Sequence, residues 1–415
     1  MRGPSKKKLA VCIGLISPIA FAQSNVTIYG VVDVSAQGFS LLPGKAGDFS
    51  SSSGRPAEGS TFNVQNNTSL LGFRGEEYVR SDLKFLFVAE TALNMTGGSG
   101  VAFGTGTLFG GLRDTYLSAV GGYGQIKLGY NSTPFRTSLV SFDVMPGGAT
   151  GSSDITRIMG GMRFTPRAVN GTNDSGDALA YSSAVRATSI VYSTPTWQGL
   201  KGAVAYTGSN NNGTNNLTNT DLCGTSLSAC TVTPQSAWGF NLGWAGYGID
   251  TQIAFQQANY HLAPLEQFHI NDVGDFTSFL VGAAYTGFPG LKLSSVFIRN
   301  NLQSNGTSTI ADGPNILTNN QLWAGASYRF GANEPRIAVV WNSDTNGSGD
   351  QQYGARQWNL NWGYYLSKRT QLYGVVSYLS NSANQNYSFG FQSSNLLPTG
   401  GQDLLTYGTG IRTTF

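Results

Sequence analysis

Few side chains in this sequence are of the types that perform bond chemistry, and they do not cluster. The two histidines, His261 and His269, lie in one polar connecting region, and a metal site needs more ligands at closer spacing. A Ser–His pair could involve either histidine, but no hydrolase motif surrounds them. The run Gly104-x-Gly106-x-x-x-Gly110 misses the dinucleotide-binding spacing and opens a predicted strand rather than a helix. We therefore expect no metal and no cofactor.

The cysteines indicate an exported protein. Cys223 and Cys230 are separated by six residues in a stretch rich in Thr, Ser and Asn, and Cys12 lies near the N-terminus. Disulfides persist in oxidising compartments outside the cytoplasm. We expect Cys223 and Cys230 to form a disulfide that closes a small external ring.

The first 22 residues have the three parts of a cleavable signal peptide. A basic region is followed by an apolar stretch from Leu9 to Ile19 and by the small-x-small triplet Ala20-Phe21-Ala22. Such a segment is too short to span a membrane as a stable helix. We expect residues 1–22 to be removed, so that residues 23–415 form the mature domain.

Composition favours a membrane barrel over a nucleic-acid-binding protein. Four of the 25 basic residues lie in the predicted signal peptide, which leaves 21 basic against 22 acidic residues. Only 11% of the chain is charged, against about 25% in an average protein. No later segment has the run of about 18 apolar residues that a transmembrane helix needs. Abundant glycine and aromatic residues fit a barrel that is apolar outside and polar inside, with a soluble β-sandwich or propeller as the alternative.

The hydrophobic pattern predicts strands. Phe73 and Arg74 fall on opposite faces of one run, and Phe87 and Glu90 on opposite faces of the next, as the two-residue period of a strand requires. Sixteen runs begin near Thr27, Thr68, Leu83, Leu108, Gly124, Ala187, Leu200, Ala237, Ile249, Thr277, Leu291, Asn320, Arg336, Gln351, Thr370 and Leu404. Short turns alternate with long polar connections, which is typical of outer-membrane barrels. The predicted fold is all-β, a 16-stranded antiparallel transmembrane β-barrel.

The longest connection, from about Ser132 to Val185, carries balanced charges. Its charged residues include four arginines and four aspartates, Arg136, Arg157, Arg163, Arg167, Asp143, Asp154, Asp174 and Asp177. A structureless loop of this length is uncommon in a compact domain unless it is functional. It could fold inward and narrow the barrel, or it could remain an ordinary external loop, and the residues alone leave both open.

Five motifs, in order, resemble those of the general trimeric porins of Gram-negative bacteria, in the branch common in beta-proteobacteria and neisseriae. They are Asn25-Val-Thr-Ile-Tyr-Gly-Val-Val-Asp33, Ser69-Leu-Leu-Gly-Phe-Arg-Gly-Glu-Glu77, Leu108-Phe-Gly-Gly-Leu-Arg113, Tyr365-Leu-Ser-Lys-Arg-Thr370 and Tyr407-Gly-Thr-Gly-Ile-Arg-Thr-Thr-Phe415. The resemblance covers essentially the whole mature chain. It implies a homotrimer in the bacterial outer membrane, surrounded by lipid and lipopolysaccharide, with the third loop folded into each barrel.

The resemblance also implies which residues form the pore constriction. Arg74, Arg113 and Arg186 match wall arginines of the second, fourth and sixth strands, and Asp143 matches an acidic position early in the constriction loop. The chain departs from the family at Tyr130, where the family often has arginine. We expect this departure to remove one positive charge from the pore wall and so to weaken anion selectivity.

Further candidates complete the predicted site. Lys127 and Glu90 are candidates for the wall, and Asp154 and Arg163 for the loop. Phe415 matches the terminal aromatic residue that serves the family as an assembly signal. The expected function is passive diffusion of small hydrophilic solutes and ions with mild anion preference, since charge at the narrowest point sets selectivity. A barrel hydrolase and a structural or adhesin barrel are the alternatives.

Overall fold

The computed structural model describes residues 25–45, 59–96, 108–145, 155–164, 179–208, 236–262, 273–304, 316–346, 352–389, 398 and 401–415. The predicted signal peptide lies outside these residues, as do Asp154, Cys223, Cys230 and His269. Within the described residues, no helix is long and apolar enough to cross a membrane.

Strands make up most of the described regular structure. They are β1 (Asn25–Leu41), β2 (Gly59–Asn66), β3 (Leu70–Arg80), β4 (Leu83–Leu93), β5 (Phe109–Gly121), β6 (Gly124–Ser132), β7 (Gly161–Phe164), β8 (Leu179–Ser182), β9 (Arg186–Ser193), β10 (Leu200–Thr207), β11 (Ser236–Gly246), β12 (Ile249–Leu262), β13 (Val273–Tyr285), β14 (Leu291–Ser304), β15 (Ile316–Tyr328), β16 (Asn333–Asn342), β17 (Ala355–Tyr365), β18 (Thr370–Asn381) and β19 (Leu404–Thr414). The helical elements among these residues are α1 (Pro134–Ser141) and the 3₁₀ turn η2 (Ile155–Arg157).

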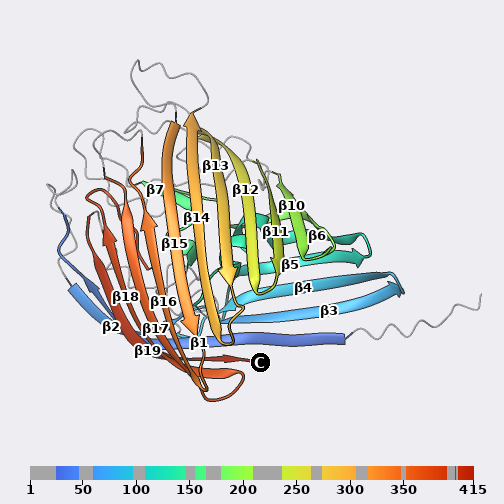
Figure 1. The fold of residues 1–415 in the computed structure, drawn as a ribbon, viewed down its shortest axis with the longest axis horizontal. Coiled ribbons are helices and arrows are strands. Elements are labelled where there is room, and N and C mark those ends of the chain that lie inside the picture. The colour runs from blue at the N-terminus through green and yellow to red at the C-terminus, as the bar shows by residue number, and fades with distance from the viewer. Residues whose placement is uncertain are drawn as a thin grey trace, which may run out of the picture.

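Seventeen of the described strands form one antiparallel sheet, in which neighbours along the chain pair in succession (Figure 1). The ring closes at β1, which pairs with β19 on one side and with β2 and β3 on the other. Because β2 and β3 pair with successive halves of β1, they are one barrel strand interrupted at residues 67–69. The described chain thus forms a closed barrel of sixteen strands, which confirms the predicted fold, although the second strand begins earlier than Thr68 and contains an unpredicted break.

Short turns lie at one end of the barrel and long connections at the other. The two residues that join β11 to β12, Tyr247 and Gly248, both have positive φ, at 53° and 77°. Two central residues of this kind make a type I′ turn, whose twist matches the strands it joins and fixes their register. The long connections include residues 42–58, 133–185 and 382–403.

Alternation separates the two faces of the sheet. On β17, Gln357 and Asn359 are buried inside the barrel, while Trp358, Leu360 and Trp362 point outward and are exposed. The apolar face can contact hydrocarbon and the polar face can hold water, and the closed sheet leaves no unpaired edge in the membrane.

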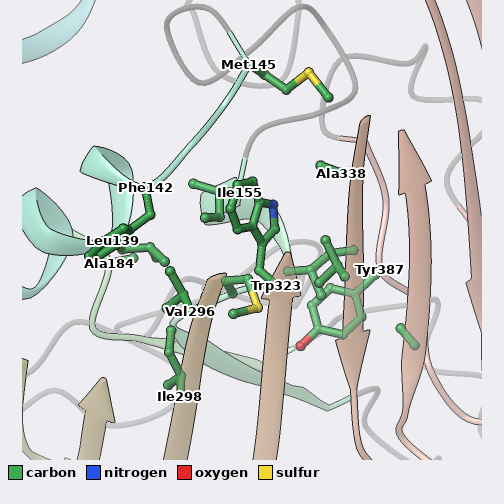
Figure 2. Packing of buried hydrophobic residues seen from close by; sticks show 14 of the residues in the cluster. Leu139, Phe142, Met145, Ile155, Ala184, Val296, Ile298, Trp323, Ala338 and Tyr387 are labelled. Atoms are coloured by element: carbon green, nitrogen blue, oxygen red, sulfur yellow. The ribbon is translucent and has the colours of Figure 1, made fainter. Parts of the chain in front are cut away.

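One part of the interior is apolar, because the longest connection folds inward. Helix α1 begins after Thr133, whose hydroxyl accepts a hydrogen bond from Arg136 N at 3.2 Å, an ordinary N-cap. Phe142, which follows α1, belongs to the same buried cluster as Val296 of β14 and Trp323 of β15 (Figure 2). The inward-folded alternative for this loop is therefore confirmed.

Candidate functional site

A group of charged and aromatic side chains gathers on the inner wall formed by β1, β3, β4 and β5. The Tyr29 hydroxyl donates a hydrogen bond to Glu90 Oε1 at 2.8 Å, and Arg113 Nε lies 3.7 Å from Glu90 Oε2. The guanidinium of Arg74 lies 5.6 Å from the centre of the Tyr29 ring. Glu90 therefore links Arg113 to a tyrosine that also contacts Arg74.

Lys127 extends this group onto β6. Its ammonium lies 4.9 Å from the centre of the Tyr116 ring, a distance at which a cation is attracted to the ring face. The structure thus brings four of the predicted wall residues to one side of the barrel interior. Tyr29 and Tyr116 were not predicted, although their alternation with outward-facing Ile28 and Leu117 could have indicated them.

Arg186 makes a different contact. Its Nε lies 3.3 Å from Asp114 Oδ1, and the same oxygen accepts hydrogen bonds from Ser132 N at 2.7 Å and Ser132 Oγ at 3.0 Å. Arg186 pairs in register with Ser132. Backbone alternation puts it on the outward face together with exposed Ile190, opposite to buried Ser189. Arg186 therefore does not join the wall group inside the barrel. The group around Asp114 fixes the point where the longest connection leaves β6, and Asp114 is a member that sequence reasoning missed.

Tyr130 does not line the interior. It pairs with Thr188, and its neighbours on the same face, Leu128 and Ile190, are exposed on the outside of the barrel. A basic residue at this position would lie outside the channel. The expectation that Tyr130 removes a charge from the inner wall is therefore wrong.

The inward-folded loop is fixed to the wall of β14 by hydrogen bonds to its backbone. Lys292 Nζ donates to the carbonyl of Asp143 at 2.7 Å, and Ser294 Oγ donates to the carbonyl of Phe142 at 2.6 Å. The carboxylate of Asp143 accepts a hydrogen bond from Met145 N at 2.9 Å and is largely buried. Asp143 therefore takes part in holding the loop.

Arg163 joins the loop to the connection that follows β18. Its Nε donates to Asn386 Oδ1 at 2.9 Å, and Gln385 Nε2 donates to the Arg163 carbonyl at 3.2 Å. Tyr387 of the same connection accepts a hydrogen bond at its hydroxyl from Asn342 Nδ2 of β16, at 3.0 Å. Burial raises the pKa of the Tyr387 phenol, so the ring remains neutral in this packing.

The wall group and the docked loop lie on opposite sides of the ring. Counting β2 and β3 as one, β4 is the third barrel strand and β14 the eleventh of sixteen, half a circuit apart. The charged wall group thus lies across the barrel from the place where the loop is anchored to β14 through its backbone.

A second buried ionic group lies on the seam between β1 and β19. Arg412 Nη1 lies 3.0 Å from Asp33 Oδ2, while the hydroxyl of Tyr373 and the amide of Asn67 donate to Asp33 Oδ1 at 2.7 and 2.8 Å. Asn67 stands in the break between β2 and β3. The break therefore turns an amide toward the seam, and none of these residues was predicted.

A closed antiparallel sheet with an apolar outer face and a polar inner face defines a transmembrane β-barrel. The model of one family, described as Gram-negative porin, matches residues 9–384. The chain therefore belongs to the Gram-negative porin family, and it is an outer-membrane protein.

Individual relatives agree with this placement. Outer membrane porin protein 32 of Delftia acidovorans is 30% identical over 202 residues, which are 48% of this chain and 49% of that protein. The chain thus spans about half the length of this curated relative.

Solved structures share the fold. The anion-selective porin from Comamonas acidovorans has a TM-score of 0.66 at 21% identity, over 94% of this chain and all of that one. The trimer form of OmpT, an outer membrane protein of Vibrio cholerae, has a TM-score of 0.56 at 11% identity, over 94% of this chain and 99% of that one. At these identities the likeness concerns the fold alone.

Proposed function

We propose that this protein forms a water-filled channel for the passive diffusion of small hydrophilic solutes and ions, with a mild preference for anions. The observation that carries this proposal is the wall group, in which the three cations Arg74, Arg113 and Lys127 lie around the carboxylate of Glu90. A net positive wall inside a wet, restricted passage attracts anions and repels cations.

On the loop side, two described charges are engaged in holding the loop to the wall. The carboxylate of Asp143 is bound by the loop backbone, and the ammonium of Lys292 is bound by loop carbonyls. Solutes pass along the wall group, because the docked loop fills the other side of the barrel. We therefore assign the sign of the selectivity to the wall group on β3, β4, β5 and β6.

The remaining predicted site residues keep a supporting place in this proposal. Arg186 acts through Asp114 on the origin of the loop, and Arg163 links the loop to residues 385–386. We assign both to the shape of the passage. Asp154 and the proposed Cys223–Cys230 disulfide remain predictions, because they lie outside the described residues.

The chain assembles as a homotrimer in this proposal. Its support is the family and the solved trimer form of OmpT, which has the same fold. A heat-resistant oligomer on a gel that dissociates to the monomer on boiling is the expected result. A single monomeric species in mild detergent, by light scattering, would contradict it.

The channel itself is tested in a planar lipid bilayer. We expect stepwise single-channel conductance and, in a salt gradient, a zero-current potential of the sign given by anion preference. A barrel hydrolase or an adhesin has no need of an open passage, so absence of conductance from correctly folded protein would favour those classes. Conductance with cation preference would support the channel but would contradict the role of the wall group in selectivity.

A further inference from the structure

One sequence motif takes no part in the wall group or in the docking of the loop. Tyr365-Leu-Ser-Lys-Arg-Thr370 ends β17, forms the turn that follows it and begins β18. This turn, residues 366–369, lies at the short-turn end of the barrel, as does the turn that joins β15 to β16. β15 to β18 are consecutive neighbours in the sheet (Figure 1). The motif therefore forms part of one segment of the rim at that end.

The side chain of Tyr365 points into the barrel and contacts an arginine of the neighbouring turn. Tyr364 is exposed on the outer face, so alternation turns Tyr365 inward. The guanidinium of Arg329 lies 3.9 Å from the centre of the Tyr365 ring, and a guanidinium stacked on a ring keeps the N–H groups at its edge available. Arg329 is exposed, and among the residues that the structure describes its side chain forms no hydrogen bond or ion pair.

The carboxylate of Glu334 is paired with a different arginine. Glu334 Oε2 lies 2.7 Å from Arg336 Nη2 and accepts a hydrogen bond from the hydroxyl of Tyr365 at 2.6 Å. The side chain of Arg336 is buried, and its Nη1 donates to Asn361 Oδ1 at 2.6 Å. Arg336 thus balances the charge of Glu334. The charge of Arg329 is the one that a bound anion would neutralise.

A glycine makes room for the buried arginine. A Cβ added at Gly363 would lie 2.8 Å from Arg336 Nη1, so the guanidinium occupies the space that a side chain would take. The buried Arg336 holds Glu334, and Glu334 holds the Tyr365 ring on which Arg329 rests. A cation that is held in place before a ligand arrives loses less side-chain entropy on binding.

These residues are separate from the wall group. From Leu83, where β4 begins at the short-turn end, to Glu90 the chain advances seven residues, or roughly 23 Å along the strand. Arg329 directly follows Tyr328, the last residue of β15, at that same end. Charges farther apart than about 8 Å are largely screened at physiological salt. A passing anion therefore meets the two groups one after the other.

We propose that Arg329, Glu334, Arg336 and Tyr365, here called the exit group, form a carboxylate-binding site at the periplasmic mouth of the channel. The site rests on the proposed channel function, because it acts on anions that pass through the barrel. Short turns face the periplasm in such barrels. The edge of a guanidinium matches both oxygens of a carboxylate, a geometry that an ammonium does not offer and a chloride ion does not use.

The members of the exit group have different roles. Arg329 contacts the anion, and Tyr365, Glu334 and Arg336 are positioning residues. The wall group sets the sign of the selectivity, and the exit group adds a preference among anions, for small organic carboxylates over chloride.

The test measures citrate, a tricarboxylate, in two ways on the full-length protein. In planar bilayers, citrate is added on the periplasmic side of oriented channels, and the decrease of the chloride current is titrated. Titration calorimetry of citrate into the detergent-purified protein measures binding without any need for conductance. Arg329→Gln removes the charge, and Arg329→Lys keeps the charge without the planar edge. The matched control is Lys368→Gln, because Lys368 is also exposed and lies in the turn that follows β17.

We expect Arg329→Gln to weaken citrate block and citrate binding roughly three- to tenfold at low salt, because a charge-assisted bidentate contact is lost at an exposed site. Arg329→Lys should weaken both by a smaller factor and leave the zero-current potential in KCl unchanged, because it conserves the charge. Tyr365→Phe keeps the ring but loses the hydrogen bond to Glu334, so it should weaken citrate binding with the same zero-current potential. Lys368→Gln should keep citrate affinity within about twofold.

Equal weakening by Arg329→Gln and Lys368→Gln would mean general electrostatic attraction at the mouth and would overturn the site. Unchanged citrate affinity in Arg329→Gln, or no citrate binding by the unsubstituted protein, would also overturn it. The channel fails separately. A protein that binds citrate through Arg329 without conducting contradicts only the channel, and one that conducts anions with citrate affinity independent of Arg329 contradicts only the exit group.

Discussion

Glu90 is the residue on which the charge of the inner wall depends. It accepts a hydrogen bond from Tyr29 and lies beside Arg113, while Arg74 and Lys127 rest against tyrosine rings. The rings hold these cations near the wall without neutralising them, since a cation–π contact leaves the charge in place. The wall group therefore presents more positive than negative charge to the passage.

Neutralising one wall arginine should shift selectivity toward cations. For Arg74→Gln we expect the anion-to-cation permeability ratio to fall roughly two- to fivefold at low salt, because exposed charges interact weakly in water and are screened as salt rises. Glu90→Gln should shift the ratio the other way. The zero-current potential in a salt gradient measures both. The control is Arg299→Gln, because Arg299 of β14 is exposed and alternates with the inward-facing Ile298 and Asn300. A similar shift in the control would show that selectivity does not depend on the position of Arg74 at the inner wall.

A glycine beside the wall group offers a test that changes no charge. A Cβ added at Gly72 would collide with the ring of Tyr29, so Gly72→Val should displace that ring and break its hydrogen bond to Glu90. We expect altered selectivity with unchanged formal charge. The matched control is Gly374→Val, because a Cβ added at Gly374 of β18 would meet only the carbonyl oxygen of Gly408, at 3.9 Å. Identical channel recordings for the two variants would mean that Tyr29 does not position Glu90.

Alternation in the sequence was sufficient to place several of these residues. Arg74 and Glu90 follow directly from the outward-facing Phe73 and Phe87, since a strand has a period of two. The ion pair of Asp33 and Arg412 could not be derived in this way. Its members belong to strands at opposite ends of the chain that meet only when the ring closes.

At the scale of elements, the docked loop depends on one aromatic ring. Phe142 is almost fully buried, and a Cβ added at Gly282 of β13 would collide with its ring. The loop is therefore fitted to a wall position that has no side chain. Its hydrogen bonds to Lys292 and Ser294 act alongside this packing.

Phe142→Ala should loosen the loop without changing any charge. Truncating a buried Phe costs about 3–5 kcal/mol, and here the loss falls on loop docking, because the strand ladder remains intact. We expect larger current noise, higher mean conductance and a lower midpoint of thermal unfolding. Gly282→Val should reproduce the noise by displacing the same ring. Quiet channels of unchanged conductance in both variants would mean that the loop does not narrow the passage.

The direction of this loop had a sequence signal that the strand pattern obscured. Val296 and Ile298 face inward on β14, and Phe297 between them faces outward. Three consecutive apolar residues indicate a strand covered on both faces, whereas a water-filled interior requires alternation. Helix α1 itself is too short and too weakly patterned to have revealed its partner.

At the scale of the whole molecule, closure of the ring involves Phe415. Its backbone N and O exchange hydrogen bonds of 3.1 Å with Gly30 of β1, and a Cβ added at Gly30 would lie 2.5 Å from the Phe415 ring. Phe415→Ala and Gly30→Leu should both lower the yield of assembled oligomer, while Phe415→Tyr should largely preserve it. Heat-resistant bands on gels measure the yield. Equal yields of oligomer for all three variants would show that assembly does not depend on Phe415.

The apolar lining of one inner wall has a consequence for any attempt to widen this conduit. Val296, Ile298 and Trp323 are dry only because the longest connection covers them. Excising that connection would leave an apolar strip exposed along an aqueous passage. Exposed apolar patches bind other hydrophobic surfaces. Detergent tails, lipid or an unfolded segment would adhere there. A wider channel made from this barrel would therefore need hydrophilic substitutions on β14 and β15 in addition to the excision.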